Sequence, residues 1–334
     1  MKIIVPMAGM GKRMRPHTLT TAKPLIPIAG KPIVQRLVED IVKVCQDPVD
    51  EIAYIIHPSF GKSVEDHLTQ VAESLGAKGT IHYQSEALGT AHAIMCAESA
   101  LKGNVVVAFA DTLFRADFKL DNQADGIIWV KQIEDPRQFG VVKVNENGFI
   151  TDFVEKPEQF VSDLAIIGIY YFKDGENLAA EIKYLLDNNI TEKGEFQLTN
   201  ALENMQKKGL QFKPGTVSDW LDCGNKSITV DTNTRYLDFI QGESLVSKTV
   251  NLSNSLIIQP SYVGEGVVLT NSIVGPYVSI GDNTRVENSV ISNSIIQKNS
   301  VIQNKVIASS LIGNYAKIAG KPTDVSLGDY SEIE

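Results

Sequence analysis

The sequence has few of the features that mark secreted or membrane-spanning proteins. Its cysteines, Cys45, Cys96 and Cys223, are odd in number and far apart, which favours reduced thiols and gives no metal-binding spacing. The longest clean apolar runs, such as residues 105–110, are much shorter than the roughly 20 residues of a transmembrane helix. The first 13 residues contain no apolar stretch long enough for a signal peptide, so we expect a cytoplasmic protein.

Positive charge is also scarce, since 31 Lys and Arg residues stand against 40 Asp and Glu residues and give a net charge of -9. This excess of negative charge repels a phosphate backbone, so we expect no nucleic-acid partner. A small phosphorylated ligand can still bind where basic side chains or a metal ion reverse the charge locally. What the sequence does have is a 43% hydrophobic share over 334 residues, which is enough for two domains with real cores.

Residues 1–243 alternate between strand-like and helix-like segments. Apolar residues recur with the helical period in residues 32–45, and residues 105–110 form a fully apolar strand. Asn147-Gly148 between two apolar segments predicts a hairpin. This pattern predicts a Rossmann-like α/β domain, with a mostly parallel mixed sheet and helices on both faces.

The composition changes after this first domain, where Ile, Val, Asn, Ser and Gly dominate. Aliphatic residues recur at six-residue spacing, for example at Val274, Ile280 and Val286. One inward aliphatic residue in six is typical of a parallel β-helix, and we interpret residues 255–319 as about four such coils rather than as antiparallel strands. The second predicted domain spans 250–334, and its exposed flat face favours a homo-oligomer.

Glycines and basic residues share the loop after the first strand. Gly9 and Gly11 allow backbone N–H groups to approach a phosphate, while Arg13 and Lys23 can hold a triphosphate and offset charge in a transition state. Met14 stands where a dinucleotide-binding motif has its third glycine, and the loop does not match the phosphate-binding P-loop either. The loop therefore predicts a phosphate site of another kind.

Two aspartates are candidate metal ligands. Asp111 follows a buried strand, at the edge where open α/β sheets bind ligands. Mg²⁺ prefers one or two carboxylates together with substrate phosphates. Asp222 lies among aromatic and glycine residues and is a second candidate, although each aspartate could instead cap a helix or form a turn.

These motifs, in this order and spacing, resemble the sugar-phosphate nucleotidyltransferases, also called nucleotide-sugar pyrophosphorylases. The resemblance covers nearly the whole chain and is strongest to members of the glucose-1-phosphate thymidylyltransferase and uridylyltransferase type, which carry a C-terminal left-handed β-helix. The segments that carry it are residues 9–13, 23–27, 30–33, 84, 88–92, 109–111, 139–142, 153–157, 194–195 and 220–224.

The resemblance implies a direct in-line attack by a sugar 1-phosphate oxygen on the α-phosphorus of a nucleoside triphosphate, with release of pyrophosphate. It implies that Arg13 and Lys23 are catalytic and contact the phosphates, and that Asp111 and Asp222 hold Mg²⁺. The other implied contacts are Ala8, Gly9, Gly11, Gln84, Gly89 and Thr90 for the nucleotide, and Gly140, Glu155, Lys156 and Glu195 for the sugar phosphate.

The resemblance also bears on the choice of substrate. Relatives acting on N-acetylglucosamine 1-phosphate commonly have Asn where this chain has Ile166, which favours a plain hexose such as glucose 1-phosphate. Gln84 occupies the position at which relatives recognise uracil or thymine. A carboxamide can pair with the N3–H and O4 edge of these bases, so we expect UTP or dTTP as the nucleotide substrate. Lys12 and Asn225 replace the Thr of many relatives, but neither change removes a charge.

Two alternative functions fit parts of the sequence. A hexapeptide-repeat acyltransferase usually has a histidine base in its coils, whereas the last of the five histidines here is His92. A regulatory paralogue that senses nucleotide sugars typically loses a metal carboxylate or a loop cation. This chain keeps both carboxylates, Asp111 and Asp222, and both cations, Arg13 and Lys23. We therefore expect an enzyme, in which His82 and His92 are structural.

Overall fold

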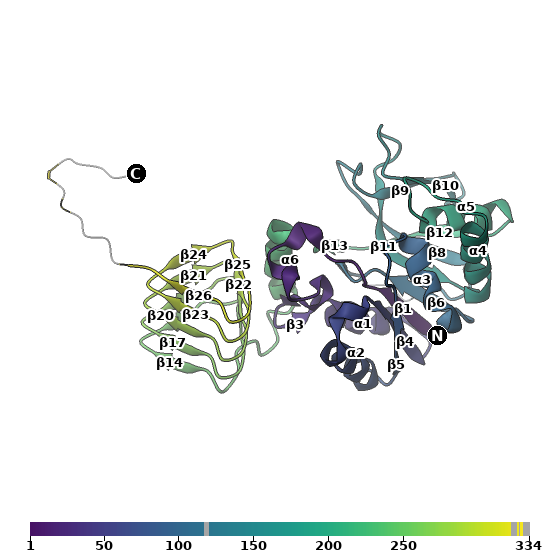
Figure 1. Ribbon diagram of the computed structural model, residues 1–334. Coiled ribbons are helices and arrows are strands. Elements are labelled where there is room, and N and C mark those ends of the chain that lie inside the picture. The colour runs from purple at the N-terminus through teal and green to yellow at the C-terminus, as the bar shows by residue number, and fades with distance from the viewer. Residues whose placement is uncertain (117–119, 322–325, 327, 330–334) are drawn as a thin grey trace. The chain divides into compact units, whose positions relative to one another are not determined.

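The computed structural model describes residues 1–116, 120–321, 326 and 328–329, and it divides into two compact units (Figure 1). The first unit comprises Met1–Ile26 and Lys31–Gly224, and the second comprises Pro27–Gly30 and Asn225–Glu334. This division places helix α6, Lys226–Phe239, in the second unit. The domain ranges 1–243 and 250–334 remain a prediction.

The first unit is built on a nine-stranded mixed sheet, whose main path runs β10-β9-β11-β6-β1-β4-β5, with β8 and β12 branching from β11. The strands are β1 (Lys2–Pro6), β4 (Glu51–Ile56), β5 (Lys78–Tyr83), β6 (Val105–Ala108), β8 (Gly126–Gln132), β9 (Gly140–Val144), β10 (Ile150–Glu155), β11 (Leu164–Phe172) and β12 (Phe212–Thr216). Strand β1 is parallel to both its neighbours, with Ile4 in register with Ala53 and Val107. Strand β11 runs antiparallel to β6, which makes the sheet mixed, as predicted.

Helices cover both faces of this sheet. They are α1 (Ile33–Val44), α2 (Lys62–Ser74), α3 (Thr90–Met95), α4 (Gly175–Asp187) and α5 (Leu198–Lys207), with the 3-10 turns η1 (Lys12–Met14), η2 (His17–Leu19), η3 (Lys23–Leu25), η4 (Pro58–Phe60) and η5 (Glu98–Ala100). Val105 and Val107 point into the core formed with α3, α4 and α5, whereas Val106 lies beside Ile41 of α1. Within the described residues, no helix combines the length and the apolar character needed to cross a membrane.

Helix α3 is short, and a predicted strand is shorter in the structure than expected. Helix α3 ends at Met95, and the chain continues as the separate turn η5. The strand expected over residues 105–110 ends at Ala108 in the structure, although Phe109 still donates its N–H to the carbonyl of Gly168 on β11 at 2.9 Å. Asp111 therefore lies on a loop after β6, directly before β7 (Thr112–Arg115).

A second, two-stranded sheet was not predicted. Strand β7 pairs antiparallel with β13 (Asp219–Asp222), and the register sets Asp222 opposite Thr112. This pairing joins segments that are about a hundred residues apart in the sequence, and it brings the end of β13 beside the start of β7. The short strand β3, Lys31–Pro32, completes the first unit.

The second unit contains three parallel sheets, β14-β17-β20-β23-β26, β15-β18-β21-β24 and β16-β19-β22-β25, stacked coil on coil (Figure 1). The strands are β14 (Asn251–Ser253), β15 (Leu256–Ile257), β16 (Tyr262–Val263), β17 (Val268–Thr270), β18 (Ile273–Val274), β19 (Val278–Ile280), β20 (Arg285–Glu287), β21 (Val290–Ser292), β22 (Ser294–Ile296), β23 (Val301–Gln303), β24 (Val306–Ala308), β25 (Leu311–Ile312) and β26 (Lys317–Ala319); β2 is Pro27–Ile28. This arrangement fits the predicted left-handed β-helix.

The β-helix also explains the irregular period of its sequence. Asn271 and Asn288 occupy the same corner of successive coils and are 17 residues apart, whereas Asn288 and Asn304 are 16 apart. A coil of 17 residues has one side of five residues instead of six, and a coil of 16 has two such sides. Ile291, five residues from both Val286 and Ile296, is therefore the inward residue that a strict six-residue count misses.

Candidate functional site

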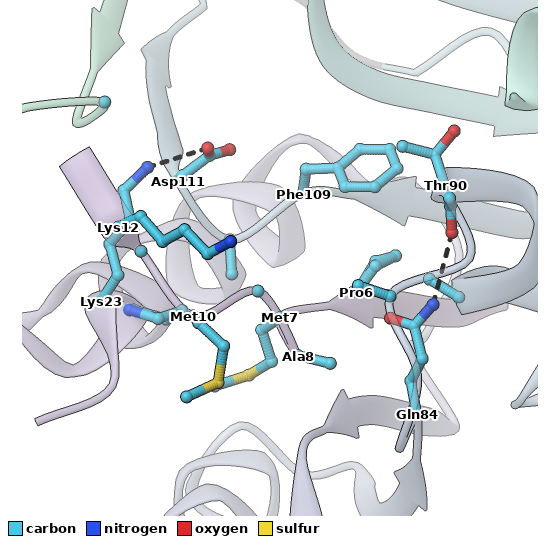
Figure 2. Close-up of a pocket in the computed structure, with 18 of the residues that line it drawn as sticks. Pro6, Met7, Ala8, Met10, Lys12, Lys23, Gln84, Thr90, Phe109 and Asp111 are labelled. Carbon is cyan, nitrogen blue, oxygen red and sulfur yellow. Dashed lines mark hydrogen bonds and ion pairs between the residues drawn. The ribbon is translucent and has the colours of Figure 1, made fainter. Parts of the chain in front are cut away.

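A cavity of about 590 Å³ opens in the first unit, beside the carboxyl ends of β1 and β6 (Figure 2). Parallel sheets bind ligands at this edge, because the loops that follow the strands converge there. The predicted site residues that line the cavity are Ala8, Gly9, Gly11, Arg13, Lys23, Gln84, Gly89, Thr90, Asp111 and Glu195. The predicted residues that do not line it are Gly140, Glu155, Lys156 and Asp222.

The loop after β1 forms one wall of the cavity, and its two glycines differ in their surroundings. A Cβ on Gly9 would meet no atom within 4 Å, so the missing side chain leaves open space. Gly11 has a φ of 56° and faces Lys23, whose Cβ would lie 2.9 Å from an added Cβ. Thr18 closes the loop by donating its hydroxyl to the carbonyl of Gly11 at 2.8 Å. Gly11 therefore shapes the loop, while Gly9 keeps the cavity open.

Lys23 and Asp111 form an ion pair across the cavity, with Nζ and Oδ2 2.9 Å apart (Figure 2). The two partners differ in exposure, since the side chain of Lys23 is 9% exposed and that of Asp111 is 46% exposed. A buried ammonium needs a compensating charge, and Asp111 supplies it. Arg13 and Lys12 line the same cavity, which is therefore locally rich in positive charge despite the net charge of the chain.

Asp222 belongs to the same electrostatic site. Cys223, its neighbour, donates its N–H to the carbonyl of Asp111 at 3.0 Å, which ties the two aspartate segments together. Burial raises the pKa of Asp222 above its ordinary value, and the negative charge of Asp111 raises it further, while Lys23 and Arg13 oppose the shift. The pairing of β13 with β7 and the hydrogen bond from Cys223 to Asp111 bring the two aspartates into one region.

The two carboxylates fit a divalent cation. They repel each other, and a cation between them would remove the repulsion that contributes to the raised pKa of Asp222. Within the described part of the chain, no cluster of three or more His, Cys, Asp or Glu side chains could enclose a metal. A pair of carboxylates matches Mg²⁺, which commonly takes its other ligands from water and substrate phosphates.

Gln84 closes the far end of the cavity, where its side chain is almost fully buried. Its amide nitrogen donates to the carbonyl of Gly89 at 3.3 Å (Figure 2) and lies 3.1 Å from Nδ1 of His92. Gly89 has a φ of 110°, and an added Cβ would lie 2.4 Å from the carbonyl oxygen of Phe196, so only glycine fits here. The Thr90 hydroxyl accepts the N–H of Leu198 at 2.9 Å.

The predicted sugar-phosphate residues form a second group on the β9–β10 hairpin. Gly140 is in register with Glu155, and a Cβ on Gly140 would lie 3.1 Å from Oε2 of Glu155. Lys156 has a φ of 44° and forms an ion pair of 3.1 Å with Glu155. Glu195 is the member of this predicted set that reaches the cavity lining. The structure thus brings Gly140, Glu155 and Lys156 together but outside that lining.

Two residues in the site were not identified as functional from the sequence. Gln197 is 6% exposed, accepts the hydroxyl of Thr90 at 3.3 Å and donates to Oε2 of Glu195 at 3.2 Å. It therefore links one predicted nucleotide residue to one predicted sugar residue. His92 was expected to be structural, yet it contacts Gln84. The sequence gives only weak signals for these contacts. Gln197 is a polar residue at the start of α5, and His92 follows Gly89 by three residues.

A family model described as nucleotidyl transferase matches residues 2–238. A glucose-1-phosphate thymidylyltransferase of Streptomyces antibioticus is 27% identical over 367 aligned positions, covering 100% of this chain and 99% of that protein. The bifunctional protein GlmU of Methanocaldococcus jannaschii is 30% identical, covering 89% of this chain and 74% of that protein. The region matched by the family model contains every predicted site residue.

Solved structures share the fold. A UDP-glucose pyrophosphorylase in complex with UDP-glucose aligns with a TM-score of 0.59 at 23% identity, covering 71% of this chain and 98% of that one. The C-terminal coils lie beyond the region that the family model matches. This structural similarity therefore supports the fold alone.

Proposed function

The chain belongs to the nucleotidyl transferase family, and from this premise we propose that it joins glucose 1-phosphate to UTP or dTTP and releases pyrophosphate. Support for glucose 1-phosphate comes from relatives named glucose-1-phosphate thymidylyltransferase, which align over the full chain. Support for a pyrimidine base comes from Gln84, which is buried at the end of the cavity and can present its side-chain oxygen to the N3–H of the base. The predicted homo-oligomer and cytoplasmic location remain predictions.

The observation that carries this proposal is the ion pair of Lys23 and Asp111 beside a glycine loop and a second carboxylate. Two anionic substrates can meet only where positive charge offsets their repulsion. Lys23, Arg13 and Lys12 provide that charge from the protein. We assign Asp111 and Asp222 as the ligands of Mg²⁺, which when bound would neutralise phosphate charge.

In the proposed reaction, an oxygen of the sugar 1-phosphate attacks the α-phosphorus of the triphosphate. A new phosphorus–oxygen bond forms as the bond between the α-phosphorus and the bridging oxygen breaks, and pyrophosphate leaves with that electron pair. The attacking oxygen is already anionic at neutral pH, so the site needs no strong base. Its residues therefore act by positioning the reactants and by neutralising charge.

The proposed contacts follow the two groups of residues. Ala8, Gly9 and Gly11 approach the triphosphate through their backbone, while Gln84, Gly89 and Thr90 face the base. Lys156 binds the phosphate of the sugar substrate. Gly140, Glu155 and Glu195 contact its hydroxyl groups.

A matrix of nucleoside triphosphates against several sugar 1-phosphates, read by pyrophosphate release with Mg²⁺, tests the proposal. We expect the highest kcat/KM with glucose 1-phosphate and with UTP or dTTP. Asp111→Asn tests the assigned metal ligand. Its amide oxygen can still accept a hydrogen bond from Lys23, so the fold should be preserved, while turnover should fall by orders of magnitude. No turnover with any pair would instead favour a regulatory nucleotide-sugar sensor.

A further inference from the structure

The orientation of the Gln84 amide is fixed by two neighbours. One is the carbonyl oxygen of Gly89, which can only accept a hydrogen bond, so the group 3.3 Å away must be the amide nitrogen of Gln84. The other is Nδ1 of His92, 3.1 Å from the same nitrogen. Because an amide nitrogen cannot accept, Nδ1 of His92 must be unprotonated, and the neutral ring must carry its hydrogen on Nε2.

These two bonds use both hydrogens of the amide nitrogen. What remains for a ligand in the cavity is the carbonyl oxygen of Gln84, which is an acceptor only. From the sequence, we expect the whole carboxamide of Gln84 to pair with the N3–H and O4 edge of the base. The structure leaves the oxygen for N3–H and no free amide hydrogen for O4.

An acceptor-only group discriminates between pyrimidines. Uracil and thymine present an N3–H donor, whereas cytosine presents an unprotonated N3 acceptor at the same position. Two acceptors facing each other leave both unpaired in a buried site, which costs free energy. If the amide turned over, however, its nitrogen would face the base and cytosine would gain a donor.

We propose that His92 is a positioning residue that, through its Nδ1 acceptor, holds the Gln84 amide in the orientation that selects uracil or thymine and rejects cytosine. This inference rests on the proposed function, because it concerns how the same cavity reads the base. His92 itself does not line the cavity, and it acts through Gln84. Its effect should therefore appear in base selectivity rather than in the chemical step.

The test compares two variants of the full-length protein. His92→Leu removes the acceptor, whereas His92→Asn can place an amide oxygen near the position of Nδ1. We expect His92→Leu to reduce the ratio of kcat/KM for UTP to that for CTP by about five- to tenfold, the factor for one hydrogen bond. The KM for UTP should rise while kcat changes little. His92→Asn should keep most of the wild-type ratio.

A purely structural role predicts a different pattern, in which His92→Leu lowers turnover with UTP and CTP by the same factor. That result, or a His92→Asn ratio as low as that of His92→Leu, would overturn the inference. Thermal unfolding of both variants shows whether equal losses follow from instability. If the wild-type protein prefers ATP or GTP, the proposed function fails; if it prefers UTP or dTTP and the ratio does not move, only the role of His92 fails.

Discussion

Gly9 and Gly11 are two residues apart in one loop, yet alanine should affect them in opposite ways. A Cβ on Gly9 enters open space, and the backbone there needs no glycine, so Gly9→Ala should change stability by less than about 0.5 kcal/mol. The same methyl group projects where we propose that the triphosphate approaches the loop. Since a misplacement of about 1 Å can cost about a hundredfold in rate, we expect a loss of kcat/KM of that order.

Gly11→Ala should instead destabilise the protein. Its φ of 56° is left-handed, which costs a residue with a Cβ about 1–2 kcal/mol. The new Cβ would also lie 2.9 Å from Cβ of Lys23 and 3.0 Å from Cγ2 of Thr18, and such crowding costs about 1–3 kcal/mol. The two effects together predict a loss of about 2–5 kcal/mol, or roughly 4–20 °C in Tm.

The assays are thermal unfolding and pyrophosphate release on the same preparations. Gly76→Ala is the matched control, because Gly76 also has a left-handed φ, of 79°, but an added Cβ meets nothing within 4 Å. It should lose only the strain of about 1–2 kcal/mol and keep full activity. The reasoning is refuted if Gly9→Ala retains wild-type kcat/KM, or if Gly11→Ala is no less stable than Gly76→Ala.

Three further predictions concern charge and the β-helix. Asp222→Asn should abolish turnover but raise the Tm of the metal-free protein at neutral pH. Because the pKa of Asp222 is raised in the folded protein, its ionisation as the pH rises lowers the stability of the wild type but not that of the variant. Tm measured against pH should therefore show the difference between variant and wild type vanish below the ordinary pKa of 3.8. Asp111→Ala should lower stability by about 1–3 kcal/mol and more than Lys23→Met, because it leaves the buried ammonium unpaired, as denaturant unfolding would show. Asn288→Ala should cost about 1–2 kcal/mol at its φ of 46°, whereas Asn288→Gly should recover the backbone strain, measured by Tm.

The loop after β1 could be identified from the sequence because its parts are local. Gly9, Gly11, Arg13 and Lys23 lie within fifteen residues, and a strand before them fixes the edge of the sheet where they gather. Asp111 could also be identified from the sequence, because it follows a fully apolar strand. For these residues, strand direction alone predicts a shared cavity, and the structure places all of them in its lining.

Asp222 could not be located in this way. Its place beside Asp111 depends on the pairing of β13 with β7, which neither periodicity nor composition reveals. The local sequence made Asp222 a candidate ligand that could equally form a turn, and only the family resemblance paired it with Asp111. The orientation of Gln84 was also beyond the sequence, because it depends on a carbonyl and a ring nitrogen that face it only in the folded chain. The six-residue count in the β-helix failed at Ile291 because the sides before and after it have five residues each.

The β9–β10 hairpin lies outside the lining of the cavity, yet it is coupled physically to the aspartate pair. The ring of Phe139, next to Gly140, meets that of Trp220 edge-on with centroids 4.7 Å apart. Trp220 in turn donates its Nε1–H to the hydroxyl of Thr112 at 2.7 Å, across the sheet that carries Asp222. Aromatic packing and a buried hydrogen bond are short-range, so they hold the hairpin and the small sheet in a fixed relation. The hairpin residues proposed for the sugar and the aspartates proposed for the metal are therefore held in place through the shared contact of Phe139 with Trp220. This favours a site that is already arranged before its substrates bind.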